Sequence, residues 1–67
     1  MKEFAERLKD LRLEKGLSQR ELAKLVNLSH TAILRWENQT RIPNGEAIVA
    51  LAKFFGVTTD YLLGLTD

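Results

Sequence analysis

Cysteine is absent from this chain, and histidine, tryptophan and proline occur once each among its 67 residues. The absence of cysteine excludes disulfides and thiolate metal ligands. No second histidine exists to complete a metal site, so we expect no metal and no other cofactor. The remaining polar residues form no evident catalytic triad or carboxylate pair, so we do not expect an enzyme.

Long apolar segments are also missing. No segment approaches the ~20 residues needed to cross a membrane, and the N-terminus lacks the apolar stretch of a secretory signal. We therefore expect a cytoplasmic protein without membrane contact. A chain of 67 residues predicts one domain, residues 1–67, that buries only about 60% of its unfolded surface.

The net charge is only +1, which by itself says nothing about a nucleic-acid partner. The charges are nevertheless distributed unevenly. Residues 1–41 hold nine lysines and arginines against six acids, whereas residues 42–67 hold one against three. The basic part contains the pattern described next, which favours a nucleic-acid surface there, although ordinary solvated helix faces would give the same distribution.

Residues 17–38 carry the most informative pattern. Ser18 is a candidate N-cap, because its hydroxyl can accept a bond from a free N–H of the first helical turn. Glu21, three residues later, completes a capping box, and Leu17 and Leu22 form a hydrophobic staple around the cap. This pattern predicts that a helix begins at residue 19.

A second helix start follows eleven residues later. Ser29 is its N-cap, and Leu28 and Ile33 form its staple. Asn27 lies in the connection and tolerates a left-handed backbone better than other residues with side chains. The pattern predicts two short helices joined by a tight turn, over residues 19–26 and 30–37.

Three more helices are predicted around this pair. Phe4, Leu8 and Leu11 recur at helical spacing over residues 3–14, and Gly16 ends that helix. Residues 38–44 form a polar loop. A fourth helix runs from the N-cap Asn44 to Gly56, and its broad apolar face predicts that it is the central buried helix, with Ala47, Ile48, Leu51, Ala52 and Phe55 on that face.

The last helix spans about residues 59–63. Val57 and Leu62 form a staple around the N-cap Thr58, and Gly64 ends the helix. No alternating strand pattern occurs anywhere. We therefore expect a compact, all-α domain of five helices.

The second short helix presents a polar face. Ile33 and Trp36 share its inner side, where Trp36 is a core residue rather than a stacking platform. The outer side shows four residues that suit insertion into the DNA major groove: His30, Thr31, Leu34 and Arg35. Arg35 can donate two parallel hydrogen bonds to guanine O6 and N7, and Leu34 can contact a thymine methyl. The alternatives are that Arg35 contacts phosphate or is a plain surface charge, and that His30 has no role.

The spacing of these residues resembles the helix-turn-helix of phage repressor and Cro proteins, the xenobiotic-response-element (XRE) type. The resemblance rests on Gln19, Ala23, Asn27, Ile33 and Trp36. It extends over about residues 4–64 through Lys15-Gly16-Leu17-Ser18-Gln19, Trp36-Glu37-Asn38, Arg41-Ile42-Pro43, Phe55-Gly56-Val57 and Asp60-Tyr61-Leu62-Leu63-Gly64. The family usually has glycine where this chain has Asn27 and Gln39, and Gln39 should tolerate a left-handed backbone less well.

The resemblance implies a lambda-repressor-like fold, a helix-turn-helix unit at about residues 18–37 and sequence-specific binding of double-stranded DNA by a transcriptional regulator. It also implies an ion pair between Arg12 and Glu37; the alternative is two unpaired surface charges. The residues expected to contact phosphates are Gln19, Ser29, Asn38, Gln39, Thr40 and Arg41.

A homodimer on an operator is the expected assembly, with two half-sites about one DNA turn (~34 Å) apart. Repression is favoured over activation, because such a dimer can occlude a promoter. Tyr61, Leu63 and Leu65 either form a dimer patch or lead into a C-terminal effector or oligomerisation domain. The alternative function is a protein-interaction module, such as an antitoxin-like domain whose partner is a protein.

Overall fold

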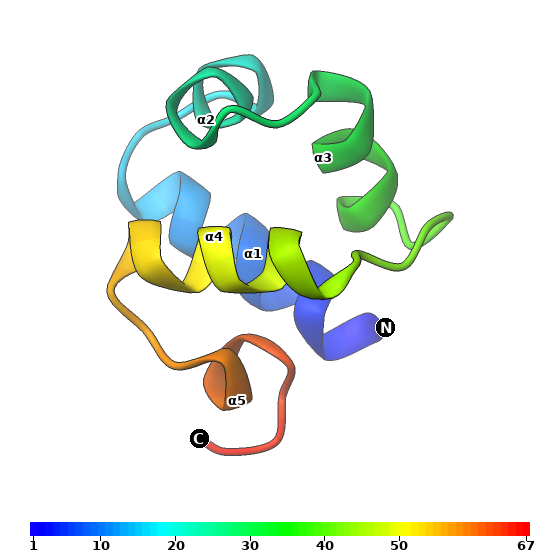
Figure 1. Cartoon of the computed structure of the whole chain (residues 1–67), viewed down its shortest axis with the longest axis vertical. Helices are drawn as coiled ribbons and strands as arrows, with labels where there is room; N and C mark the ends of the chain where they lie inside the picture. Colours follow the sequence, from blue (N-terminus) through cyan, green and yellow to red (C-terminus); the bar gives the residue numbers. More distant parts are fainter.

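Five helices follow one another along the chain, and no strand lies between them (Figure 1). The computed structural model describes all residues, 1–67. The helices are α1 (Lys2–Glu14), α2 (Gln19–Val26), α3 (His30–Glu37), α4 (Gly45–Phe55) and α5 (Thr59–Leu62). The prediction of an all-α fold with five helices is confirmed. Only the start of α1 and the end of α5 differ from the predicted boundaries, each by one residue.

The four predicted N-caps all form. Ser18, Ser29, Asn44 and Thr58 each accept a hydrogen bond from the backbone N–H three residues later. At α2 the bond is reciprocated, because the Ser18 N–H donates to Glu21 Oε1 at 2.8 Å. Polar side chains therefore fix where four of the five helices begin.

All five helices also end in the same way, with a left-handed residue just after the helix: Gly16, Asn27, Gln39, Gly56 and Gly64. After α3 the Thr40 N–H donates to the Arg35 carbonyl at 2.9 Å, and the Gln39 N–H donates to the Trp36 carbonyl at 3.3 Å. This pair of backbone hydrogen bonds is a Schellman motif. Gln39 adopts φ 66° without being glycine, which costs about 1–2 kcal/mol.

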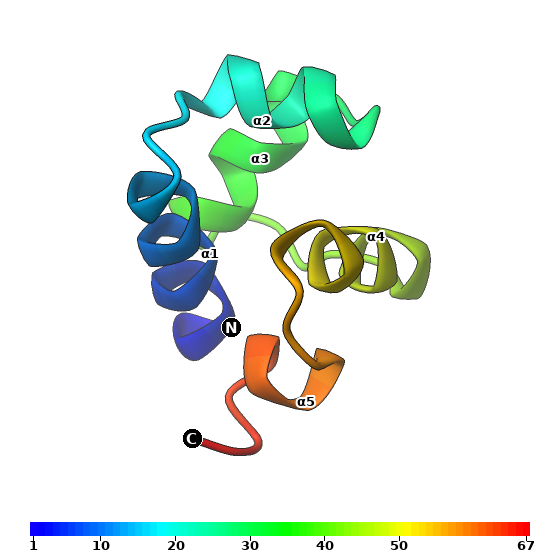
Figure 2. The same ribbon diagram turned by 90° about the vertical axis from the view of Figure 1, so that its left-hand side faces the viewer.

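The core receives one fully enclosed leucine or isoleucine from each helix: Leu8, Leu22, Ile33, Leu51 and Leu62. Trp36 is buried as predicted and meets Phe4 edge-on, with ring centroids 6.3 Å apart. Figure 2 shows α1 and α4 on opposite sides of the molecule, with α2 and α3 above and α5 below. The core thus lies where all five helices meet.

The prediction that the fourth helix is the central buried one is wrong. α4 lies at the side of the molecule (Figure 2), and its outer face leaves Val49 43% exposed between Glu46 and Lys53. Ile48 and Phe55 are only partly buried. Within these 67 residues none of the other four helices covers this outer face, since a domain of this size buries only about 60% of its unfolded surface.

The C-terminal segment contacts α1 through the side chain of Arg7. Arg7 donates to the carbonyls of Tyr61 and Thr66, and its guanidinium lies 4.3 Å from the centroid of the Tyr61 ring. Leu63 is partly buried, whereas Leu65 is 70% exposed. Of the three residues expected to form additional apolar surface, only Leu65 is therefore largely open to solvent.

Replacing Gln39 by glycine should stabilise the protein. The substitution removes the left-handed strain but makes the unfolded chain more flexible, so the expected net gain is about 0.5–1 kcal/mol. Thermal unfolding should show a melting temperature a few degrees higher. Gln39→Ala is the control, since it removes the side chain and keeps the strain. Equal melting temperatures for the glycine and alanine variants would contradict this account.

The capping box predicts a pH-dependent contribution from Glu21. Hydrogen bonds with Ser18 lower the pKa of Glu21. The bond from the Ser18 backbone has the larger effect, and the bond with the Ser18 hydroxyl has the smaller one. A carboxylate whose pKa is lowered by folding stabilises the protein above its unfolded value of about 4.3, and this stabilisation is lost as the pH falls through the folded value. Glu21→Gln should therefore lower the melting temperature at pH 7 and lower it less at pH 3.

The exposed Glu6, which caps no helix, provides the control for this measurement as Glu6→Gln. An equal loss of stability in Glu21→Gln at both pH values would show that the carboxylate charge does not matter for the cap.

Candidate nucleic-acid interface

α2 and α3 form the predicted bihelical unit. Residues 27–29 connect them, and Asn27 has the left-handed φ of 57° expected for this turn. In Figure 1 α2 is seen nearly end-on and α3 from the side, so the two helices cross steeply. Ala23, only 4% exposed, allows their close approach. The crossing leaves one side of α3 free of protein.

The free side of α3 can be deduced from the helix geometry. Successive residues turn by about 100° around the axis, so Ile33 and Trp36 direct one side into the core. Three of the four predicted base-reading residues are exposed on the other side: Thr31, Leu34 and Arg35. The fourth, His30, is partly buried at the edge of this side. We call Thr31, Leu34 and Arg35 the outward face of α3.

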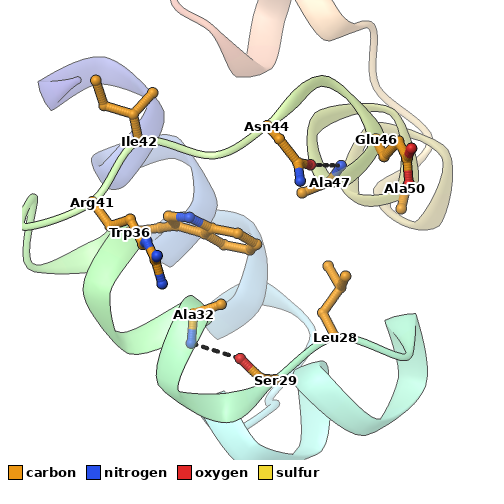
Figure 3. Close-up of a pocket in the computed structure, with 10 residues that line it drawn as sticks. All are labelled: Leu28, Ser29, Ala32, Trp36, Arg41, Ile42, Asn44, Glu46, Ala47 and Ala50. Atoms are coloured by element: carbon orange, nitrogen blue, oxygen red, sulfur yellow. Dashed lines mark hydrogen bonds between the residues drawn. The ribbon is translucent and has the colours of Figure 1, made fainter.

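One surface hollow lies between α3, the loop after it and α4. This loop-side hollow has a volume of about 620 Å³. Figure 3 shows the ten residues that line it: Leu28, Ser29, Ala32, Trp36, Arg41, Ile42, Asn44, Glu46, Ala47 and Ala50. Ser29 Oγ accepts from the Ala32 N–H at 3.0 Å, which leaves the hydroxyl hydrogen free to donate. Arg41 is exposed at this hollow and offers a cation there.

A smaller notch lies on the other flank of α3, against α1 and α2. This α1-side notch has a volume of about 220 Å³ and is lined by Lys9, Arg12, Gln19, Leu34, Glu37 and Asn38. Leu34, which also belongs to the outward face, is the only apolar residue among them. The outward face of α3 thus lies between two recesses that contain polar groups.

Arg12 and Glu37 form an ion pair at the floor of the notch. Arg12 Nε and Nη2 donate to the two carboxylate oxygens, each at 2.8 Å, and Nη1 donates to the Leu17 carbonyl at 2.9 Å. The two side chains are only 9% and 5% exposed. The hydrogen bond with Glu37 raises the pKa of Arg12 despite its burial, so the guanidinium remains charged.

Three further polar side chains of the interface are held by internal bonds. Gln19 Nε2 donates to Glu37 Oε1 at 3.2 Å. Asn38 Oδ1 accepts from both the backbone N–H and the hydroxyl of Thr40. The Thr40 side chain therefore supports the loop, whereas Gln19 and Asn38 each keep N–H groups free to donate.

Lys9 is a residue of this site that the sequence analysis missed. It lies three residues before Arg12, and residues three apart share one side of a helix. This spacing is the signal that could have found it, once Arg12 was placed next to Glu37. Lys9 is exposed at the rim of the notch and takes part in no ion pair.

Two other kinds of site do not occur in the structure. None of the helices is both long enough and apolar enough to pass through a membrane. No three His, Asp or Glu side chains gather closely enough to hold a metal ion.

Sequence comparisons relate the chain to regulators of transcription. A family model described as helix-turn-helix matches residues 8–62. The HTH-type transcriptional activator BcrR of Enterococcus faecalis is 46% identical over 61 residues, which are 91% of this chain and 30% of that protein. Repressor protein C2 of Salmonella phage P22 is 40% identical over 60 residues, 90% of this chain and 28% of that protein. The chain spans less than a third of either relative.

A solved structure has the same fold. It is the crystal structure of the P22 c2 repressor protein in complex with synthetic operator 9T in the presence of Tl+. The TM-score is 0.84 at 35% sequence identity, and the match covers 92% of this chain and 94% of that chain. The two proteins therefore share their helical architecture over nearly the whole length compared.

Removing either member of the Arg12–Glu37 pair should destabilise the protein strongly, because the remaining charge would be buried without a partner. The expected loss for Arg12→Ala or Glu37→Ala is about 3–5 kcal/mol, measured by chemical or thermal unfolding. The exposed Arg35 provides the control as Arg35→Ala, which should change stability little. Unfolding of the Arg12 and Glu37 variants at the parent's midpoint would show that the pair is not a major source of stability.

Proposed function

The chain belongs to the helix-turn-helix family, and we propose that it binds double-stranded DNA sequence-specifically for a transcriptional regulator, with α3 in the major groove. The observation that carries this proposal is the outward face of α3, which is uncovered and lies between two recesses with polar groups. An α-helix fits the major groove, and phosphate backbones border that groove on both sides. The fold shared with a repressor in complex with an operator supports the same arrangement.

The proposed base contacts come from the outward face and its edge. Arg35 is exposed and can donate two parallel bonds to guanine O6 and N7. Thr31 lies one turn earlier on the same side and can donate to or accept from a base edge. Leu34 is 41% exposed and offers an apolar contact to a thymine methyl. His30, partly buried at the edge, contacts the border of the same groove.

The proposed phosphate contacts flank these residues. On one flank they are Gln19 and Asn38, and on the other Ser29, Gln39, Thr40 and Arg41. The first backbone N–H groups of α3 have no helical partner and favour an anion near Ser29. Thr40 takes part through its backbone and its place in the loop, since its hydroxyl is bonded to Asn38. These contacts set the register of the protein on DNA without reading sequence.

The proposed assembly is a homodimer on an operator with two half-sites one DNA turn apart. One helix of eight residues presents few side chains to the groove, and two copies multiply the contacts. Relatives include a named activator and a named repressor. We favour repression, because occupancy of an operator by a dimer is sufficient to block a promoter. Because its proposed partner is DNA, we propose the cytoplasm as the location of this activity.

Arg35 and Arg41 should affect DNA binding differently. Arg35→Ala should cost about 1–3 kcal/mol on the preferred site and relax discrimination at one base pair of each half-site. Arg41→Ala should weaken all sequences by a similar factor and reduce the salt slope by about one unit. The measurement is affinity at fixed salt for every single-base variant of a site selected from a random duplex library.

Two results would contradict these assignments. If Arg41→Ala changed the ranking of sites and Arg35→Ala did not, the base-reading and phosphate-contacting faces would be reversed. If neither substitution altered DNA binding, α3 would not contact DNA, and a protein partner would become the better hypothesis. Arg20→Ala, at an exposed position of α2 that lines neither recess, is the matched control.

A further inference from the structure

The outer face of α4 carries a short pattern that the rest of the chain leaves uncovered. Glu46, Val49, Ala50 and Lys53 recur at helical spacing and form one stripe along the helix. Glu46, Val49 and Lys53 are exposed, and Ala50 is partly buried. A surface hollow of about 590 Å³ follows these residues, and all of its lining residues belong to α4. We call the four residues the α4 stripe.

The two charges of the α4 stripe have no partner within the chain. Glu46 and Lys53 lie seven residues apart, which separates them by about 10 Å along the helix, too far for an ion pair. The residues three and four positions from each charge along the stripe are Val49 and Ala50, which are apolar. Neither charge takes part in an ion pair in the structure. The stripe therefore has an acid at one end, a base at the other and an apolar centre.

The order of these residues is complementary to itself. Two copies of α4 can pair antiparallel about a two-fold axis that passes between Val49 and Ala50. Glu46 of each copy then lies opposite Lys53 of the other, so the two ends form two opposite-charge pairs. At the centre Val49 packs on Ala50 of the other copy, whose small side chain allows a close approach of the helices. A parallel pair would instead place like charges opposite each other.

The size of the α4 stripe limits the strength of such a pair. α4 has 11 residues, so the contact is about 16 Å long and about 10 Å wide, far below the ~800 Å² per partner of a stable interface. We therefore expect a pair that forms in solution at about millimolar concentration. Copies held close together on DNA reach comparable local concentrations.

The antiparallel arrangement differs from the operator dimer proposed above. In Figure 1 α4 begins below α3 and runs away from it, so α3 belongs to the N-terminal end of α4. A two-fold axis perpendicular to α4 reverses this direction in the second copy, which places the two α3 helices at opposite ends of the pair. An operator dimer requires both α3 helices to face the same duplex. The two contacts are therefore separate.

From these observations we infer that the outer face of α4 binds a second copy of this chain, with the two α4 helices antiparallel and Glu46 of each copy paired with Lys53 of the other. The contact goes beyond the proposed function and does not depend on DNA binding. Its consequence is that the outward faces of the two α3 helices turn apart. Copies bound to two separate DNA segments are thereby joined.

Charge reversal tests the pairing, with dimerisation measured by sedimentation equilibrium at up to about millimolar protein. Glu46→Lys and Lys53→Glu each place like charges opposite each other at both ends, and each should weaken dimerisation about tenfold. The double variant should dimerise like the parent, and so should an equimolar mixture of the two single variants. Lys24→Glu, at an exposed position of α2, is the control with the same change in net charge as Lys53→Glu.

The orientation is tested by cross-linking, because the chain has no cysteine of its own. Glu46→Cys and Lys53→Cys proteins are mixed and oxidised. The antiparallel pair predicts that the disulfide between the two different variants forms in preference to a disulfide between identical ones. In this mixed pair one opposite-charge contact remains at the other end of the stripe.

Four results would overturn the inference. They are a parent that stays monomeric at millimolar concentration, reversals that weaken dimerisation no more than Lys24→Glu, a double variant that does not recover, and disulfides that join identical positions preferentially. DNA binding by the parent, measured alongside, would uphold the proposed function in each case. Failure of the parent to bind any duplex while the charge reversals behaved as expected would overturn the proposed function alone.

Discussion

A single buried carboxylate joins the three helices that form the proposed DNA-binding surface. Glu37, at the end of α3, accepts two bonds from Arg12 of α1 and one from Gln19 of α2. Arg12 also bonds the Leu17 carbonyl in the connection between α1 and α2. Isolated helices of eight residues are unstable in water, so α3 depends on such contacts and on the core for its orientation. Loss of this carboxylate would remove the polar contacts that join all three helices and leave only the core to hold them together.

The two flanks of α3 are supported by different physical means. On the α1 side, Gln19 is bonded to the buried ion pair of Arg12 and Glu37, so its position follows from a rigid network. On the loop side, Arg41 follows a turn with the left-handed residue Gln39. This turn is held by backbone hydrogen bonds and by the side chain of Thr40, which bonds Asn38 and the Arg35 carbonyl. The loop flank can therefore be tuned by single substitutions at Gln39, whereas a substitution in the ion pair of the α1 flank also changes the stability of the domain.

The sequence predicted the helices well because their ends are determined by local chemistry. Each N-cap bond joins residues three apart, and each left-handed C-terminus is visible as Gly, Asn or, at Gln39, through the family resemblance. The core positions of Ile33 and Trp36 followed from helical spacing. The extent to which α4 is buried could not be predicted in this way, since the same apolar residues are compatible with a central helix and with a helix at the edge of the domain.

The candidate site was predictable in part for the same reason. The outward face of α3 follows from its spacing, and the Arg12–Glu37 pair followed from the resemblance. Lys9 was missed because its importance depends on two helices that meet only in the folded chain. The internal bonds of Gln19, Asn38 and Thr40 likewise join residues whose geometry is fixed by packing, and no local pattern distinguishes them from solvated polar side chains.

The central claim is that the outward face of α3 and its two flanks bind duplex DNA. Its most direct test is nuclear magnetic resonance of the isotopically labelled protein during titration with a selected operator duplex. We expect the amide signals of Thr31, Arg35 and Gln19 to shift, while those of Val49 and Lys53 on the outer face of α4 stay in place. Shifts confined to the α4 face, with the signals of α3 unchanged, would contradict the account.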